Sequence, residues 1–376
     1  MRKNFLIASW LFGLGNSFSS PIIGLYIYIN SSINYMLKFL LISSIFILLG
    51  YILVGYLTTF WKEALTYYKL GILLFISFYI LMFILNVKSY RFISFLGILY
   101  GLAQGFYWSG WDIIFYNIPH KLKFFNKSAY LGFFTNLVSP AVYGSILTIF
   151  HNNGYGILFL LTALTLLLSA ILAESVKVSS FKFNIRRSIS VFNENKTYRY
   201  TMTALAIVSG VNYILTNVNT IIIYKIATDY LNFAIISYSM SVITLISIYV
   251  IRDKLSGILK PYNVVLSSSL LLGISSVSII VGFPLFYLIV FSLTSPLIYP
   301  IIDVYNWNNM DRRFLTEYLV NRQIFLNSGR ILSSLSEVIL SQISGYEILP
   351  LIPLIIIASI IFVRYNSKEK IQQDVL

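Results

Sequence analysis

The sequence predicts an all-α integral membrane protein in which twelve transmembrane helices form two sets of six. Three observations lead to this prediction. The 376 residues are 58% hydrophobic and 11% charged, whereas soluble domains carry about 25% charged residues. Apolar runs of the length that a spanning helix needs, about 20 residues, recur from end to end. The longest hydrophilic segment, residues 175–194 with its flanks, lies near the midpoint of the chain.

The first half of the chain contains six apolar runs. They occupy residues 5–28, 39–61, 70–87, 92–117, 128–150 and 155–173. The first run follows Arg2 and Lys3 and is longer than the apolar core of a cleavable signal peptide, so we expect it to remain as a spanning helix. The fourth run contains Asp112 as its one charged residue.

The second half continues the pattern. Its predicted helices lie at residues 200–224, 230–251, 318–343 and 348–363, with a longer uncharged stretch at 261–302. That stretch is about twice the length of one span, and Gly282 and Pro284 predict a turn within it. The helix at 318–343 is the most polar, because it contains Arg322, Arg330 and Glu337.

The positive charges test this count of helices. Cytoplasmic segments of membrane proteins are enriched in lysine and arginine. With the N-terminus in the cytoplasm, most of the 27 lysines and arginines fall on the cytoplasmic side. Only Lys88, Arg91 and Lys225 fall outside. We therefore expect both termini to be cytoplasmic in a multi-pass protein of the cell membrane. Topology accounts for the net charge of +14, and nucleic acid is not needed as a partner.

The division at the midpoint predicts a duplicated half. We expect an N-terminal bundle of residues 1–174, a basic cytoplasmic central loop at 175–198, and a C-terminal bundle at 199–376 that ends in a short tail. No metal or cofactor is expected. The chain has no cysteine, and its two histidines fall in predicted loops.

Short motifs add a family resemblance. The first helix contains Asn16 and Pro21, the fourth contains Gly101 and Gly105 at the spacing that lets helices approach closely, and the eleventh contains Gly329 followed by Arg330. With the twelve predicted helices and cytoplasmic termini, this pattern resembles the major facilitator superfamily. The loop after the second helix departs from that family's signature. Residues 139–144 also lack the family's antiporter motif.

The resemblance implies a secondary transporter, or permease, that moves a small solute by alternating access, with protons as a candidate coupling ion. Export of a lipophilic compound is the alternative to uptake of a metabolite. A membrane enzyme or receptor with the same fold is the alternative from another class. The sequence contains none of the catalytic motifs that an enzyme would need. We expect a monomer that contacts membrane lipids.

The resemblance further implies that helices 1, 4, 7 and 10 line a central cavity. Candidate cavity residues are Asn16, Gln104, Trp108, Trp111, Asn212 and Tyr299. Aromatic rings offer a stacking surface with a polar edge, and amides offer hydrogen bonds. The alternative is that these side chains serve helix packing and interhelical hydrogen bonds.

Ionisable side chains in spanning helices point to function, because burying them in a membrane is costly. We hypothesise that Asp112 pairs with Arg322 as an inner gate, and that Asp303 pairs with Lys127 as the mirror pair. The alternative is that each acid meets interfacial lysine or water.

Arg330 and Glu337 lie deeper in the eleventh helix. They are seven residues apart, close to two helical turns, so they share a face. Arg330 is a candidate to hold an anion or to pair with Glu337, and Glu337 is a candidate proton site. The alternative is a buried pair that only holds the helix in place.

Overall fold

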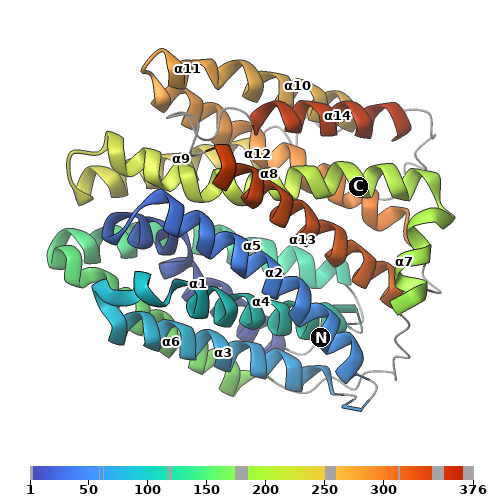
Figure 1. Cartoon of the computed structure of the whole chain (residues 1–376), viewed down its shortest axis with the longest axis horizontal. Helices are drawn as coiled ribbons and strands as arrows, with labels where there is room; N and C mark the ends of the chain where they lie inside the picture. Colours follow the sequence, from blue (N-terminus) through green and yellow to red (C-terminus); the bar gives the residue numbers. More distant parts are fainter. Residues whose placement is uncertain are drawn as a thin grey trace. The chain divides into compact units, whose positions relative to one another are not determined.

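The structure is a computed structural model that describes residues 3–58, 60–61, 63–116, 118, 121–173, 185–249, 260–311, 314–340 and 351–366. Helices account for nearly all of this part of the chain, and it contains no strand (Figure 1). The all-helical prediction is therefore confirmed.

The helices follow the predicted apolar runs closely. The first half contains α1 (Lys3–Asn30), α2 (Ile33–Leu57), α3 (Ala64–Leu85), the 3₁₀ helix η1 (Asn86–Phe92), α4 (Ile93–Tyr116), α5 (Lys121–Phe150), η2 (His151–Asn153) and α6 (Gly154–Leu172). The second half contains α7 (Ile185–Glu194), α8 (Lys196–Ile226), α9 (Tyr230–Ile246), α10 (Pro261–Ser275), α11 (Val277–Ile280), α12 (Pro284–Asn308), α13 (Leu315–Leu340) and α14 (Ile352–Asn366).

Eight described stretches are long and apolar enough to cross a membrane, so the chain is a multi-pass membrane protein. Two of them, Ala64–Phe115 and Tyr130–Leu172, each contain parts of two successive helices. Helix α14 is apolar but shorter. Helix α13 is absent from the eight because charged and polar residues recur along it.

The chain forms two compact units. Unit 1 comprises Met1–Phe183 and Thr216–Val242, and unit 2 comprises Asn184–Leu215 and Ile243–Leu376. Helix α8 is therefore shared, because its first part belongs to unit 2 and its last part to unit 1. The predicted domain boundaries at residues 174 and 199 stay a prediction.

Glycines on α4 allow close helix packing within unit 1. A Cβ added to Gly105 would lie 2.8 Å from the Cα of Gly50 on α2, and one added to Gly50 would lie 3.0 Å from the Cα of Gly105. Gly101 likewise meets the backbone of Ser43. The prediction that Gly101 and Gly105 permit a close approach is confirmed.

The segment Thr216–Val242 joins unit 1 through polar and aromatic contacts. The Tyr230 hydroxyl donates to Asn152 Oδ1 at 2.9 Å, and the rings of Tyr143 and Phe233 lie 6.0 Å apart. Gly144 faces Ala234 closely enough that a side chain there would clash. These contacts explain why this segment, which follows the sequence midpoint, clusters with the first half.

Three features of unit 2 bear on the site. Gly282 has a φ of +85°, and Pro284 begins α12, so the predicted turn is confirmed. Helix α12 continues past residue 302, where the uncharged stretch ends, to Asn308, and it contains Asp303. Helix α7 lies where a loop was expected, and that expectation was wrong for these ten residues. Its buried Ser188 and Val191 are three residues apart, so they share the face that is turned inward.

Candidate functional site

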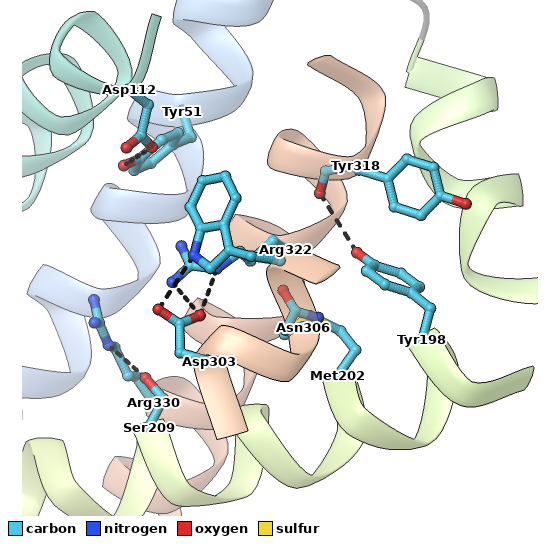
Figure 2. Close-up of polar contacts among 11 residues, drawn as sticks. Tyr51, Asp112, Tyr198, Met202, Ser209, Asp303, Asn306, Tyr318, Arg322 and Arg330 are labelled. Carbon is cyan, nitrogen blue, oxygen red and sulfur yellow. Dashed lines mark hydrogen bonds and ion pairs between the residues drawn. The ribbon is translucent and has the colours of Figure 1, made fainter. Parts of the chain in front are cut away.

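Helix α13 carries two arginines with different surroundings (Figure 2). Arg322 is bound by an acid of α12. Its Nε and Nη2 both donate to Asp303 Oδ1, at 3.2 and 2.8 Å. The indole of Trp307 donates to Asp303 Oδ2 at 3.4 Å, and its ring lies 5.3 Å from the Arg322 guanidinium carbon. Both carboxylate oxygens of Asp303 therefore have partners.

A polar network lies next to this pair in unit 2. The Tyr198 hydroxyl of α8 donates to Asn321 Oδ1 at 2.9 Å. The amide of Asn321 in turn donates to the carbonyl oxygen of Ser188 on α7, at 2.7 Å. All three residues are fully or almost fully buried. The network holds α7, α8 and α13 together at the level of Arg322.

Arg330 lies among neutral groups. Its Nε donates to Ser209 Oγ on α8 at 3.3 Å (Figure 2). Its Nη1 donates to Asn327 Oδ1 at 3.3 Å. The ring of Tyr213 lies 5.4 Å from the guanidinium carbon. Within the described ranges, no carboxylate is among the contacts of Arg330. Glu337 is fully buried further along α13, and its predicted role as a proton site stays a prediction.

The other predicted gate residues are less enclosed. Asp112 is half-buried on α4 and accepts a hydrogen bond of 3.3 Å from the Tyr51 hydroxyl of α2. Lys127 is exposed on α5. The pairings of Asp112 with Arg322 and of Asp303 with Lys127 stay predictions. In the structure, Asp303 forms its ion pair with Arg322.

Three of the predicted cavity residues in unit 1 hydrogen-bond or stack within the helix bundle. Asn16 accepts a hydrogen bond of 2.8 Å from the Tyr79 hydroxyl. The Trp111 indole donates to Ser9 Oγ at 2.9 Å, and its ring lies 5.7 Å from that of Trp108, which is 40% exposed.

The remaining cavity candidates, Gln104 of α4, Asn212 of α8 and Tyr299 of α12, are half-buried. Their role in binding stays a prediction. Among the residues whose placement is known, no cluster of three histidine, aspartate or glutamate side chains could hold a metal ion.

Sequence reasoning missed the neutral partners of Arg330 and the acidic partner of Arg322. Asp303 had been assigned to Lys127, as the mirror of the pair that was expected between Asp112 and Arg322. Ser209 and Tyr213 carried a weak signal, since Ser209 precedes and Tyr213 lies three residues after Gly210, a small residue that permits a close helix contact. Nothing in a single sequence reports which face of α8 meets α13.

The comparisons with known proteins bear on this fold. No family model matches the chain. It is 21% identical over 290 residues to the uncharacterized protein YqgE of Bacillus subtilis (strain 168). That match covers 71% of this chain and 65% of YqgE, so it spans slightly less than two thirds of that protein.

Solved structures are similar over nearly the whole chain. A D-xylose–proton symporter superposes with a TM-score of 0.73 at 11% identity, covering 96% of this chain and 97% of the symporter. The chain has the major facilitator fold. The nucleoside transporter NupG gives 0.70 at 14% identity, with 96% of this chain and 99% of NupG covered. A peptide-bound transporter of the POT family also gives 0.70, at 11% identity, covering 97% of this chain and 96% of that one. All three are transporters rather than enzymes.

Proposed function

We propose that this chain is a secondary transporter, which moves a small solute across the cell membrane by alternating access. The observation that carries the proposal is the likeness of its fold to solved solute transporters over at least 96% of its length. The half-buried and buried polar groups on α4, α8, α12 and α13 support it, because such groups in a membrane protein mark solute and ion pathways.

The proposed topology has twelve spans in two pseudo-symmetric sets of six, with both termini in the cytoplasm. Residues 1–174 and 199–376 form the two bundles, and residues 175–198 connect them. The twelve helices α1 to α6, α8 to α10 and α12 to α14 support this count, although α14 is shorter than a typical span. Lysines and arginines concentrated on the cytoplasmic side support the orientation.

The proposed gate on the cytoplasmic side uses Asp112 and Arg322. In the structure Arg322 is bound to Asp303, so closing this gate would require Arg322 to exchange one carboxylate for the other. Asp112→Asn should then raise labelling, by a cytoplasm-side reagent, of cysteines introduced along α4. Unchanged labelling and unchanged transport would contradict the gate.

Proton coupling is assigned to Glu337. A fully buried carboxyl can exchange a proton during transport when its surroundings alternate. Glu337→Gln should abolish accumulation driven by a pH gradient while exchange of solute across the membrane continues. Accumulation by the glutamine variant would reject this role.

The test of the proposed function is uptake into liposomes that contain the purified full-length chain and carry an imposed pH gradient. The first panel should contain dipeptides, pentoses, nucleosides and small organic acids, since the similar structures include peptide, xylose and nucleoside transporters. We expect at least one solute to enter faster than into empty liposomes. Equal rates for every solute in the panel would count against transport of these classes.

A further inference from the structure

Arg330 occupies the middle of α13, and no carboxylate of the described residues contacts it. It lies about 15 Å or more from either end of this helix, at 1.5 Å per residue. An arginine at such a depth is costly unless an anion compensates it. About two turns earlier in the same helix, the charge of Arg322 is compensated by a carboxylate, because it donates two hydrogen bonds to Asp303.

The contacts of Arg330 leave hydrogen-bond donors unused. A guanidinium has five N–H donors. Ser209 and Asn327 each accept from one of them, and the ring of Tyr213 lies 5.4 Å from the guanidinium carbon. In the part of the chain that the structure describes, the other three donors, including both on Nη2, have no protein acceptor. These donors form a fork, which matches the two oxygens of a carboxylate or phosphate.

The surroundings of Arg330 are held in place before any ligand arrives. Gly329 and Gly210 bring the backbones of α13 and α8 together so closely that a side chain at either position would clash. This contact places Ser209 beside Arg330. Asn327 is fully buried, and its amide donates to the Gln323 carbonyl at 2.8 Å, which turns its Oδ1 toward the guanidinium. Arg330 itself is only half-buried, so a ligand can reach it.

We infer that Arg330, with Ser209, Tyr213 and Asn327, binds the anionic group of the transported solute, so that the substrate is a small carboxylate- or phosphate-bearing compound. This inference rests on the proposed transport function and names its substrate class. The bound oxyanion supplies a counter-charge that Arg330 does not receive from the described residues, and the neutral groups orient the guanidinium toward it.

The first test supplies the anion from within the protein. Asn327→Asp replaces an amide with a carboxylate of the same shape beside Arg330. In the purified full-length chain, the midpoint of thermal unfolding should rise by about 2 °C or more. The same substitution in an Arg330→Gln background should lower the midpoint, because the new carboxylate is then buried without a partner. Lower midpoints in both backgrounds would overturn the inference.

Ser209→Asp repeats this test without removing the hydrogen bond from Asn327 to Gln323. It should also raise the midpoint only when Arg330 is present. Ser336→Asp is the matched control, because Ser336 lies on the exposed face of the same helix. That control should give the same change of midpoint with and without Arg330.

The second test identifies the oxyanion. Inorganic phosphate, succinate and the neutral dimethyl ester of succinate are added separately to the purified protein. We expect phosphate or succinate, but not the ester, to raise the unfolding midpoint. The rise should vanish in Arg330→Gln and persist in Arg364→Gln, which removes an exposed arginine from α14. An equal rise in Arg330→Gln would reject the site.

Failure of this inference differs from failure of the proposed function. Uptake of a neutral solute that Arg330→Gln leaves unchanged would retain transport and remove the anion site. Binding of an anion through Arg330 with no uptake of that anion into liposomes would retain the site and remove transport.

Discussion

Arg322 and Arg330 both lie on α13, and at 100° per residue their side chains are about 80° apart around the helix axis. They differ in the groups that compensate their charge. Arg322 is matched by Asp303 of α12, whose second oxygen also accepts from Trp307. Arg330 contacts a hydroxyl, an amide and an aromatic ring. The difference teaches that α13 carries one arginine with a carboxylate partner and one whose described partners are all neutral. A ligand can supply a negative charge only to the second arginine.

The largest expected effect comes from breaking the completed pair. Asp303→Asn should leave the buried Arg322 charge without its carboxylate and destabilise the protein by about 3 kcal/mol. Thermal unfolding followed by tryptophan fluorescence would measure the loss. The double variant Asp303→Asn with Arg322→Gln should recover part of it, because no isolated charge then remains. A double variant as unstable as the single one would show that the charges are not coupled.

A second effect should come from the helix contact beneath Arg330. Gly329→Val places a side chain against the backbone of Ala206 on α8. Forcing the two helices apart should cost about 2 kcal/mol. Gly132→Val is the control, since an added Cβ there would meet no atom within 4 Å. Equal unfolding midpoints for the two variants would mean that α8 and α13 do not pack closely in solution.

Removing Arg330 should have a smaller effect on stability than breaking the Arg322–Asp303 pair. Arg330→Gln deletes a charge that has no acidic partner in the described structure, so the free energy of unfolding should change by less than about 1 kcal/mol. Uptake of the solute should nevertheless fall by at least about tenfold, as expected for loss of a charge-assisted contact. A stability loss as large as that of Asp303→Asn would mean that Arg330 contributes to stability as much as the ion-paired Arg322 does.

The smallest effect is expected at Asp112, the acid of α4. The Tyr51 hydroxyl donates a hydrogen bond of 3.3 Å to this half-buried carboxylate. Tyr51→Phe should therefore lower the free energy of unfolding by only about 0.5 kcal/mol. Chemical denaturation in detergent would measure it. A cost near that of Asp303→Asn would mean that Asp112 is held as firmly as the acid of α12.

Much of the fold could be predicted because a membrane imposes strong constraints on sequence. A run of about 20 apolar residues is readable without a structure, and the helices follow such runs. The turn at Gly282 and the close packing at Gly105 also had local signals. Each depends on glycine, which adopts positive φ angles and lets helices approach closely whatever the rest of the fold.

The candidate site was less predictable because it depends on which helix faces meet. Arg322, Arg330 and Glu337 stood out as charges in a spanning helix. Their partners did not, since Ser209 and Asp303 are separated from them by 121 and 19 residues. The grouping of Thr216–Val242 with unit 1 was also unforeseen. It arises from contacts such as Tyr230 with Asn152, which no periodicity encodes.

Helix α7 has a practical consequence for experiments that express the two halves as separate polypeptides. The Arg187 guanidinium carbon lies 3.5 Å from the Phe314 ring centre, and Phe192 stacks on Phe325 at 4.2 Å. This short helix thus belongs with the second fragment. If the gene is divided upstream of Ile185, α7 stays on the same polypeptide as Phe314 and Phe325. If it is divided after Glu194, α7 is on the first polypeptide and these rings on the second lose their partners.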